Sequence, residues 1–267
     1  MSYSIGFIGG GNMAGAIVKG LVGGNIYSEN EIIVSVLRSE SLERIKTELG
    51  VDATLVNSEV AEKSKIVILA VKPHFIVKVL EEISPVLTED HLVISIAAGI
   101  TLDQMKSYTG KAKLFRAMPN TPAAVNAAMT SICSDLPQND PVAKIVYDIF
   151  SAIGRVEFIT EAQIHAAIAV HGSSPAYAFM MMEAMGDAGV LLGLPRDQAY
   201  RMAAQSLYGA ALMMLESGKH PGALKDQVTS PGGTTIVAVA SLEEQGFRNA
   251  VIDSMRKCAD KSKEMSS

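Results

Sequence analysis

A glycine-rich turn near the start of the chain is the feature that most constrains its fold. The turn, GGGNMA, occupies residues 9–14 and follows the apolar run at residues 5–8. Apolar side chains then recur at helical spacing, at Ala14, Ile17, Val18 and Leu21. Gly9 permits a tight turn, Gly11 leaves room for a pyrophosphate, and the first N–H groups of a helix attract phosphate. A strand, a G-x-G-x-x-A turn and a helix in this order predict a dinucleotide site, with a purely structural turn as the alternative.

The overall composition limits the class of protein and its partners. The chain has 267 residues, of which 48% are hydrophobic, so it can form two domains or one large one. A net charge of −5 without a basic block predicts no nucleic-acid partner, and no apolar run approaches the roughly 18 residues that span a membrane. The first strand begins too early for a signal peptide, and the two cysteines, Cys133 and Cys258, lie far apart. We therefore expect a cytoplasmic protein with reduced thiols.

The end of the second expected strand, Glu31–Val36, bears on the choice of cofactor. In NAD-binding units an acidic residue at this point holds the adenosine ribose hydroxyls. Here the strand runs into Leu37, Arg38 and Ser39, with no acid at its tip. A guanidinium and a hydroxyl suit a 2′-phosphate, which favours NADPH over NADH. A solvated surface arginine is the alternative.

Alternating strands and helices fill the rest of the first half. Further strands are expected at 51–56, 66–71, 92–96, 113–116, 129–133 and 155–159, and helices at 41–49, 57–63, 75–83, 102–108 and 141–153. Two of the strands end at Lys72-Pro73 and at Ala97-Ala98-Gly99, and the carboxyl ends of parallel strands face the ligand crevice. The loop MPNTP at 118–122 holds two prolines at another strand end, where a rigid turn and a functional loop are both open interpretations.

From Thr160 onwards the pattern is helical. Thr160 and Gln163 form a capping-box pattern, and helices are expected at 162–170, 176–192, 196–217 and 242–264. The fold class is therefore α/β, with a dinucleotide-binding domain at residues 1–160 followed by an all-α domain at 161–267. The methionine-rich helices are apolar on more than one side, which suits a core but also an interface with a second copy. We favour a homodimer through this half.

Two loops interrupt the expected helices. One spans His171–Tyr177 and the other Lys225–Thr235, and the second concentrates small and hydroxyl residues at Ser230, Gly232, Gly233, Thr234 and Thr235. Successive N–H groups of such a loop can cradle a carboxylate, although simple helix capping by the threonines is an alternative. His165 and His171 could suggest a metal pair, but no acid or cysteine stands at ligand spacing, so no metal site is predicted.

Several motifs in a fixed order resemble the Δ1-pyrroline-5-carboxylate reductase family, essentially from end to end. They are IGFIGGGNMA at 5–14, AVKP at 70–73, SIAAG at 95–99, RAMPNTPA at 116–123, GSSPAYAF at 172–179, GLPR at 193–196 and SPGGTT at 230–235. The chain departs from the family pattern at Ser174, where a glycine is usual, and at Thr234, where alanine is frequent.

The resemblance implies a function and a set of site residues. Members reduce L-1-pyrroline-5-carboxylate, a cyclic imino acid, to L-proline with NAD(P)H in the last step of proline biosynthesis. They join a Rossmann domain to a helical dimerisation domain, and many form a ring of dimers. The implied cofactor residues, with the strand-end pair included, are Ile8, Gly9, Gly10, Gly11, Asn12, Met13, Arg38, Ser39, Asn57, Ala70, Val71, Lys72, Pro73, Ala97 and Ala98. The implied substrate residues are Gln227, Ser230, Gly232, Gly233, Thr234 and Thr235, with Thr235 as the catalytic candidate beside the imine nitrogen.

Two rival functions make different demands on the sequence. β-Hydroxyacid dehydrogenases share the two-domain plan but use a lysine and a nearby asparagine on the first long helix of the second domain. Residues 166–185 contain neither. A non-catalytic NADP-binding regulator would not need the SPGGTT loop. Both rivals are therefore weaker than a reductase acting on a cyclic imine.

Overall fold

The computed structural model describes residues 2–266 and divides into two compact units. The first runs to Ser173 and also includes the segment from Cys258 onwards, and the second is Ser174–Lys257. The predicted domain boundary near residue 160 lies just after the last strand, whereas the compact units divide after Ser173. The assignment of separate functions to residues 1–160 and 161–267 stays a prediction.

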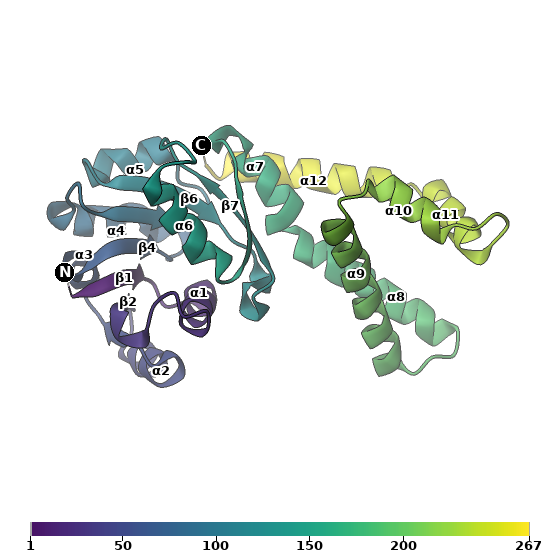
Figure 1. Ribbon diagram of the computed structural model, residues 1–267, viewed down its shortest axis with the longest axis horizontal. Helices are drawn as coiled ribbons and strands as arrows, with labels where there is room; N and C mark the ends of the chain where they lie inside the picture. The colour runs from purple at the N-terminus through teal and green to yellow at the C-terminus, as the bar shows by residue number, and fades with distance from the viewer. Residues whose placement is uncertain (1, 267) are drawn as a thin grey trace. The chain divides into compact units, whose positions relative to one another are not determined.

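The first unit is built around one eight-stranded sheet (Figure 1). Its strands, in the order β3-β2-β1-β4-β5-β6-β7-β8, are β3 (Asp52–Thr54), β2 (Ile32–Ser35), β1 (Tyr3–Ile8), β4 (Ser64–Leu69), β5 (Leu92–Ser95), β6 (Lys113–Met118), β7 (Ala128–Cys133) and β8 (Gly154–Phe158). The first six are mutually parallel, whereas β7 is antiparallel to β6 and parallel to β8. The strand order reverses between β1 and β4, and dinucleotides bind at such a switch point.

Strand β4 shows why the sheet is buried on both faces. Its side chains alternate, so that Ile66 and Ile68 belong to one hydrophobic core and Val67 and Leu69 to the other. A continuous apolar run is therefore needed, as is usual for central parallel strands. The sequence predicted such a strand at residues 66–71, and the structure confirms it with slightly earlier bounds.

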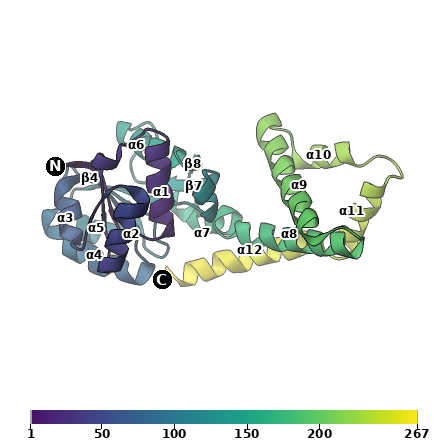
Figure 2. The same cartoon turned by 90° about the horizontal axis from the view of Figure 1, so that it is seen from below.

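Helices cover both faces of this sheet (Figures 1 and 2). One core contains side chains of α1 (Asn12–Gly23), α2 (Ser39–Leu49) and α6 (Pro141–Ser151), and the other contains those of α3 (Asn57–Lys63), α4 (Ile76–Ile83) and α5 (Leu102–Thr109). The helical face predicted for α1 is buried, at Ala14, Ile17, Val18 and Leu21. The predicted α/β class with a doubly wound dinucleotide-binding unit is confirmed.

The second unit is helical. It contains α8 (Ser174–Leu191), α9 (Arg196–Ser217), α10 (Pro221–Val228), α11 (Thr234–Glu244) and the first part of α12 (Phe247–Glu264). Helices α8 and α9 are joined by a short loop and pack against each other. No strand follows β8 in the described part of the chain. No helix within residues 2–266 is long and apolar enough to cross a membrane.

Three local expectations were wrong. The helix expected at 162–170 is a 3₁₀ turn (Glu161–Gln163, with the predicted capping box), a short α7 (Ile164–Ala167) and a π-helix (Ile168–Gly172). The loop expected at His171–Tyr177 is helical except at Ser173, and Pro175 lies in the first turn of α8, where no backbone donor is lost. The single helix expected at 242–264 is interrupted at Gly246, whose φ of 73° ends α11.

Candidate active site

The glycine turn after β1 is held from one side by neighbouring strand ends. Gly9 has a φ of 106°, and its N–H donates to the Ser35 carbonyl at 3.0 Å. A Cβ at Gly9 would come within 2.6 Å of the Ala70 oxygen, so only glycine allows the loops after β1 and β4 to approach this closely. A Cβ at Gly10 would come within 2.6 Å of Val36. The turn is therefore packed against β2 and β4 through residues without side chains.

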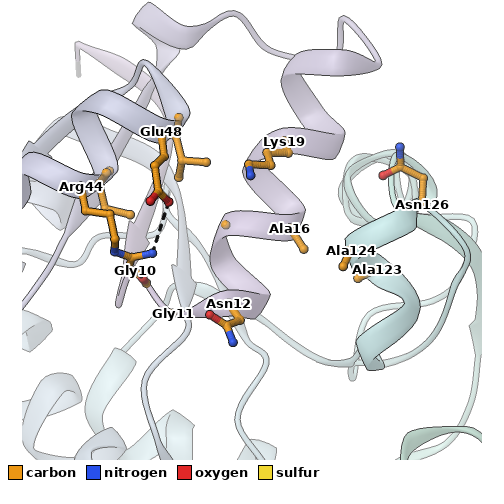
Figure 3. A pocket seen from close by; sticks show the side chains of 13 residues that line it. Gly10, Gly11, Asn12, Ala16, Lys19, Arg44, Glu48, Ala123, Ala124 and Asn126 are labelled. Carbon is orange, nitrogen blue, oxygen red and sulfur yellow. Dashed lines mark hydrogen bonds and ion pairs between the residues drawn. The ribbon is translucent and has the colours of Figure 1, made fainter. Parts of the chain in front are cut away.

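On its other side the turn is open, in the way that a pyrophosphate requires. Gly11 is the N-cap of α1 and supplies no side-chain cap, and the space where its Cβ would stand has no atom within 4 Å. The first N–H groups of α1 have no partner within the helix and carry the positive end of its dipole. A pocket of about 260 Å³ opens beside this turn, between α1, α2 and the 3₁₀ turn η4 (Thr121–Val125) (Figure 3). This cradle fits a dinucleotide phosphate.

The other residues predicted to bind the cofactor follow the carboxyl ends of neighbouring strands. Ala70 to Pro73 come directly after β4, and the Ala70 N–H donates to the Ile8 carbonyl at 2.8 Å. Ala97 and Ala98 follow β5. Because β1, β4 and β5 are adjacent and parallel, their carboxyl ends share one edge of the sheet. The structure therefore brings these predicted residues together in the first unit.

Arg38 and Ser39 stand at the N-terminus of α2, and both are exposed. They follow β2 at the same sheet edge, which leaves both side chains accessible to a ligand. Asn57 is the first residue of α3, whose N-cap is Val56. Its carboxamide accepts from the Ser35 hydroxyl at 2.7 Å and donates to Glu82 at 2.8 Å, so it connects the ends of β2 and α4.

The residues predicted to bind the substrate lie in the second unit. Gln227 belongs to the last turn of α10, Ser230 to Gly233 form the connecting turn, and α11 begins at Thr234. The turn is closed by the Gly233 N–H, which donates to the Ser230 carbonyl at 3.0 Å, and Gly232 has a φ of 69°. Gly233 is the N-cap of α11 and no side chain caps the helix, so the capping interpretation of the threonines is wrong. The open first turn of α11 can instead accept an anion.

Sequence reasoning missed a polar anchor beneath the MPNTP loop. The Asn120 carboxamide donates to the His171 carbonyl at 2.8 Å and accepts from the Met129 N–H at 2.9 Å. The His171 ring bonds through Nε2 to the Ser131 hydroxyl at 2.7 Å, and burial lowers the pKa of His171. The loop after β6 is thus tied to the π-helix, and π-helical turns are frequent near functional sites. The two prolines predicted rigidity here, but nothing in the sequence predicted these partners.

A second missed contact is an ion pair between Arg116 and Glu161. Arg116 is 3% exposed, and Glu161 also accepts from the Leu102 N–H at 2.8 Å. Within the same unit, His165 bonds to Ser262 at 2.9 Å, which ties the end of α12 to α7. Burial raises the pKa of the Cys133 thiol to about 11, so this thiol stays protonated and unreactive.

Known proteins resemble this chain over its whole length. A family model described as pyrroline-5-carboxylate reductase dimerisation matches residues 161–265, and one described as NADP oxidoreductase, coenzyme F420-dependent, matches residues 4–99. The pyrroline-5-carboxylate reductase of Escherichia coli K12 is 49% identical over 267 residues, covering 100% of this chain and 99% of that protein. The chain belongs to the pyrroline-5-carboxylate reductase family. It is accordingly an NAD(P)-dependent oxidoreductase, as the sequence predicted.

Solved structures of the family superpose closely on this one. A pyrroline-5-carboxylate reductase from Coxiella burnetii matches with a TM-score of 0.92 and 38% identity, covering 100% of both chains. A pyrroline carboxylate reductase from Plasmodium falciparum with NADP bound matches with a TM-score of 0.88 and 31% identity, covering 99% of this chain and 98% of that one. The predicted Rossmann domain followed by a helical dimerisation domain is confirmed.

The helical unit exposes the apolar surface that a dimerisation domain requires. Large hydrophobic side chains on α8 and α9 are accessible in the single chain, including Phe179 63%, Met180 68%, Met202 51%, Tyr208 61% and Met213 55%. Extensive exposed apolar surface is uncommon on monomeric proteins. The predicted homodimer through this half agrees with both the family model and this surface.

Proposed function

We propose that this protein reduces L-1-pyrroline-5-carboxylate to L-proline with NADPH, using the glycine turn of the first unit and the 230–235 turn of the second. The observation that carries the proposal is that α1 and α11 both begin at a glycine without a side-chain cap, in a chain of this family. One suits the cofactor pyrophosphate, and the other suits the substrate carboxylate.

The cofactor is held by the ends of β1, β2, β4 and β5. Gly11 to Met13 supply backbone N–H groups to the pyrophosphate, Gly9 and Gly10 shape the turn beneath it, and the loops 70–73 and 97–98 line the nicotinamide side. Arg38 and Ser39 hold the 2′-phosphate, because both are exposed at the start of α2 and a guanidinium forms charge-assisted bonds to phosphate. NADPH is then preferred over NADH. The bound cofactor supplies a hydride to the C=N carbon.

The substrate is held by the second unit. The N–H groups of the 230–235 turn and the hydroxyls of Ser230 and Thr234 bind its carboxylate, with Gln227 beside them. Thr235 is half-buried in the first turn of α11 and hydrogen-bonds the imine nitrogen. A threonine hydroxyl is a poor acid, so the imine reacts as its protonated iminium, and Thr235 orients it.

Dimerisation is required for activity. Ile236 and Val237, in the first turns of α11, are 37% and 67% exposed, so the helix that carries the substrate turn also contributes to the uncovered apolar surface. Covering that surface with a second copy fixes the turn. Further assembly into a ring of dimers, and a cytoplasmic location in keeping with the free thiols of Cys133 and Cys258, complete the proposal.

Steady-state kinetics of Thr235 variants test the assignment of the reacting site. Thr235→Val should lower kcat by about ten- to hundredfold, the loss of one hydrogen bond to a charged group, without changing the KM for NADPH. Thr235→Ser should retain most of the rate. Thr229→Val is the matched control, because that hydroxyl already bonds to carbonyls of α10. Unchanged kinetics for Thr235→Val would remove this residue from the mechanism.

A further inference from the structure

Arg44, which played no part in the predicted site, contacts the glycine turn directly. It lies in the second turn of α2, and its Nη2 donates to the Gly10 carbonyl at 2.8 Å. Its Nη1 lies 3.6 Å from a carboxylate oxygen of Glu48. Figure 3 shows the guanidinium between Glu48 and Gly10, at the rim of the pocket beside α1. Arg44 thus contacts the turn through a backbone carbonyl oxygen.

The geometry of the peptide gives this bond a consequence. The Gly10 carbonyl and the Gly11 N–H belong to one planar peptide unit, and in a trans peptide these two groups point in opposite directions. None of the described peptide bonds is cis. When Arg44 holds the carbonyl toward α2, it turns the Gly11 N–H to the opposite side, away from α2. That N–H is the first in the series that continues into the open N-terminus of α1.

Little else fixes this peptide. It lies between two glycines, so a rotation of the peptide plane meets no Cβ on either side. Gly9 is held by its bond to Ser35, and Gly10 by packing against Val36 and Ile45. A Cβ added at Gly11, in contrast, would have no atom within 4 Å. Arg44 is the contact that sets the orientation of the Gly10–Gly11 peptide.

We propose that Arg44 is a positioning residue of the dinucleotide site, which presets the Gly11 N–H for the pyrophosphate by holding the Gly10 carbonyl. The inference rests on the proposed binding of a dinucleotide at this turn. Because this donor is already oriented, the binding free energy is not reduced by the cost of ordering the loop. Because NADH and NADPH share the pyrophosphate and differ at the 2′-phosphate, Arg44 contributes equally to the affinity for both.

Direct binding measurements on the full chain test this without turnover. The dissociation constants of NADPH and NADH are measured from nucleotide fluorescence for wild type, Arg44→Met and Arg44→Lys. Arg44→Met should weaken both nucleotides by the same factor, about three- to tenfold, since the bond is to a charged donor but the side chain is 44% exposed. Arg44→Lys should recover most of the loss. Lys46→Met, which removes one exposed charge from the same helix, should change neither constant.

Each other outcome has a distinct meaning. Weakening of NADPH alone would place Arg44 at the 2′-phosphate and overturn the proposal. Equal weakening by Lys46→Met would reduce the effect to net charge, and unchanged binding in Arg44→Met would remove the role altogether. Wild-type protein that bound neither nucleotide would overturn the cofactor assignment itself. An unfolding midpoint within the wild-type range confirms that each variant is folded.

Discussion

Replacing Gly11 with alanine should separate folding from cofactor binding. Gly11 has a φ of −78° and a ψ of −178°, which alanine adopts freely, and the added Cβ has no atom of the chain within 4 Å. Alanine stabilises the protein by lowering the conformational entropy of the unfolded chain, whereas glycine is the better residue at a helix N-cap. These effects oppose each other, so the free energy of unfolding should change by less than about 1 kcal/mol.

Cofactor binding should respond far more strongly to the same substitution. The Cβ would occupy the space through which a pyrophosphate approaches the N–H groups of α1. Displacing the phosphate forfeits at least one charge-assisted hydrogen bond, about 1.5–3 kcal/mol, so the dissociation constant for NADPH should rise by about ten- to hundredfold.

The assay pairs nucleotide fluorescence titration with denaturant unfolding of the same samples. Gly23→Ala is the matched control, since Gly23 is also on α1 with no atom within 4 Å but stands at the opposite end of the helix. It should bind NADPH as the wild type does. If Gly11→Ala bound NADPH normally while folded, the pyrophosphate would not lie at this turn, and the reasoning would be refuted.

Three further predictions concern stability and assembly. Burial lowers the pKa of His171 below its ordinary value of 6.5, so its protonation opposes folding. The contribution to stability is present above about pH 6.5 and declines as the pH falls below it. In denaturant unfolding measured across this range, His171→Gln should flatten that decline. Glu161→Ala should lower the free energy of unfolding by about 2 kcal/mol, because it leaves the buried Arg116 unpaired. This figure is below that for a fully buried pair because the Glu161 side chain is 32% exposed. An unchanged unfolding midpoint would show that the ion pair contributes nothing. Met180→Glu, on the exposed face of α8, should yield folded monomers in sedimentation and abolish turnover; active monomers would contradict the need for a dimer.

Much of the first unit could be predicted from the sequence because its signals are local. The turn at Gly9 to Ala14 needs glycine for a positive φ and for close approach, and the structure shows both at Gly9. The continuous apolar run of β4 favoured a parallel strand buried on both faces, and the structure confirms it. The exposed apolar surface of α8 also follows from the sequence, since a helix that is apolar on more than one side leaves part of that surface uncovered in a single chain.

The parts that were missed depend on contacts between residues distant in the sequence. His171 and Ser131, 40 residues apart, are joined only by the fold, and so are Arg44 and Gly10. The end of the π-helix and the start of α8, at His171–Tyr177, were mistaken for a loop because Gly172 and Pro175 usually break helices. Here the proline falls in the first turn, where its missing N–H costs nothing. Local sequence patterns predict helices, strands and turns, but they do not predict which distant residues the fold brings into contact.

The central claim is that this chain reduces the imine of pyrroline-5-carboxylate with a nicotinamide cofactor. The most direct measurement is the loss of nicotinamide absorbance when purified protein is mixed with pyrroline-5-carboxylate and NADPH, and separately with NADH, with proline quantified as the product. We predict oxidation of the cofactor matched by an equal amount of proline, and a higher kcat/KM with NADPH. Failure to oxidise either cofactor, or oxidation without proline, would contradict the account.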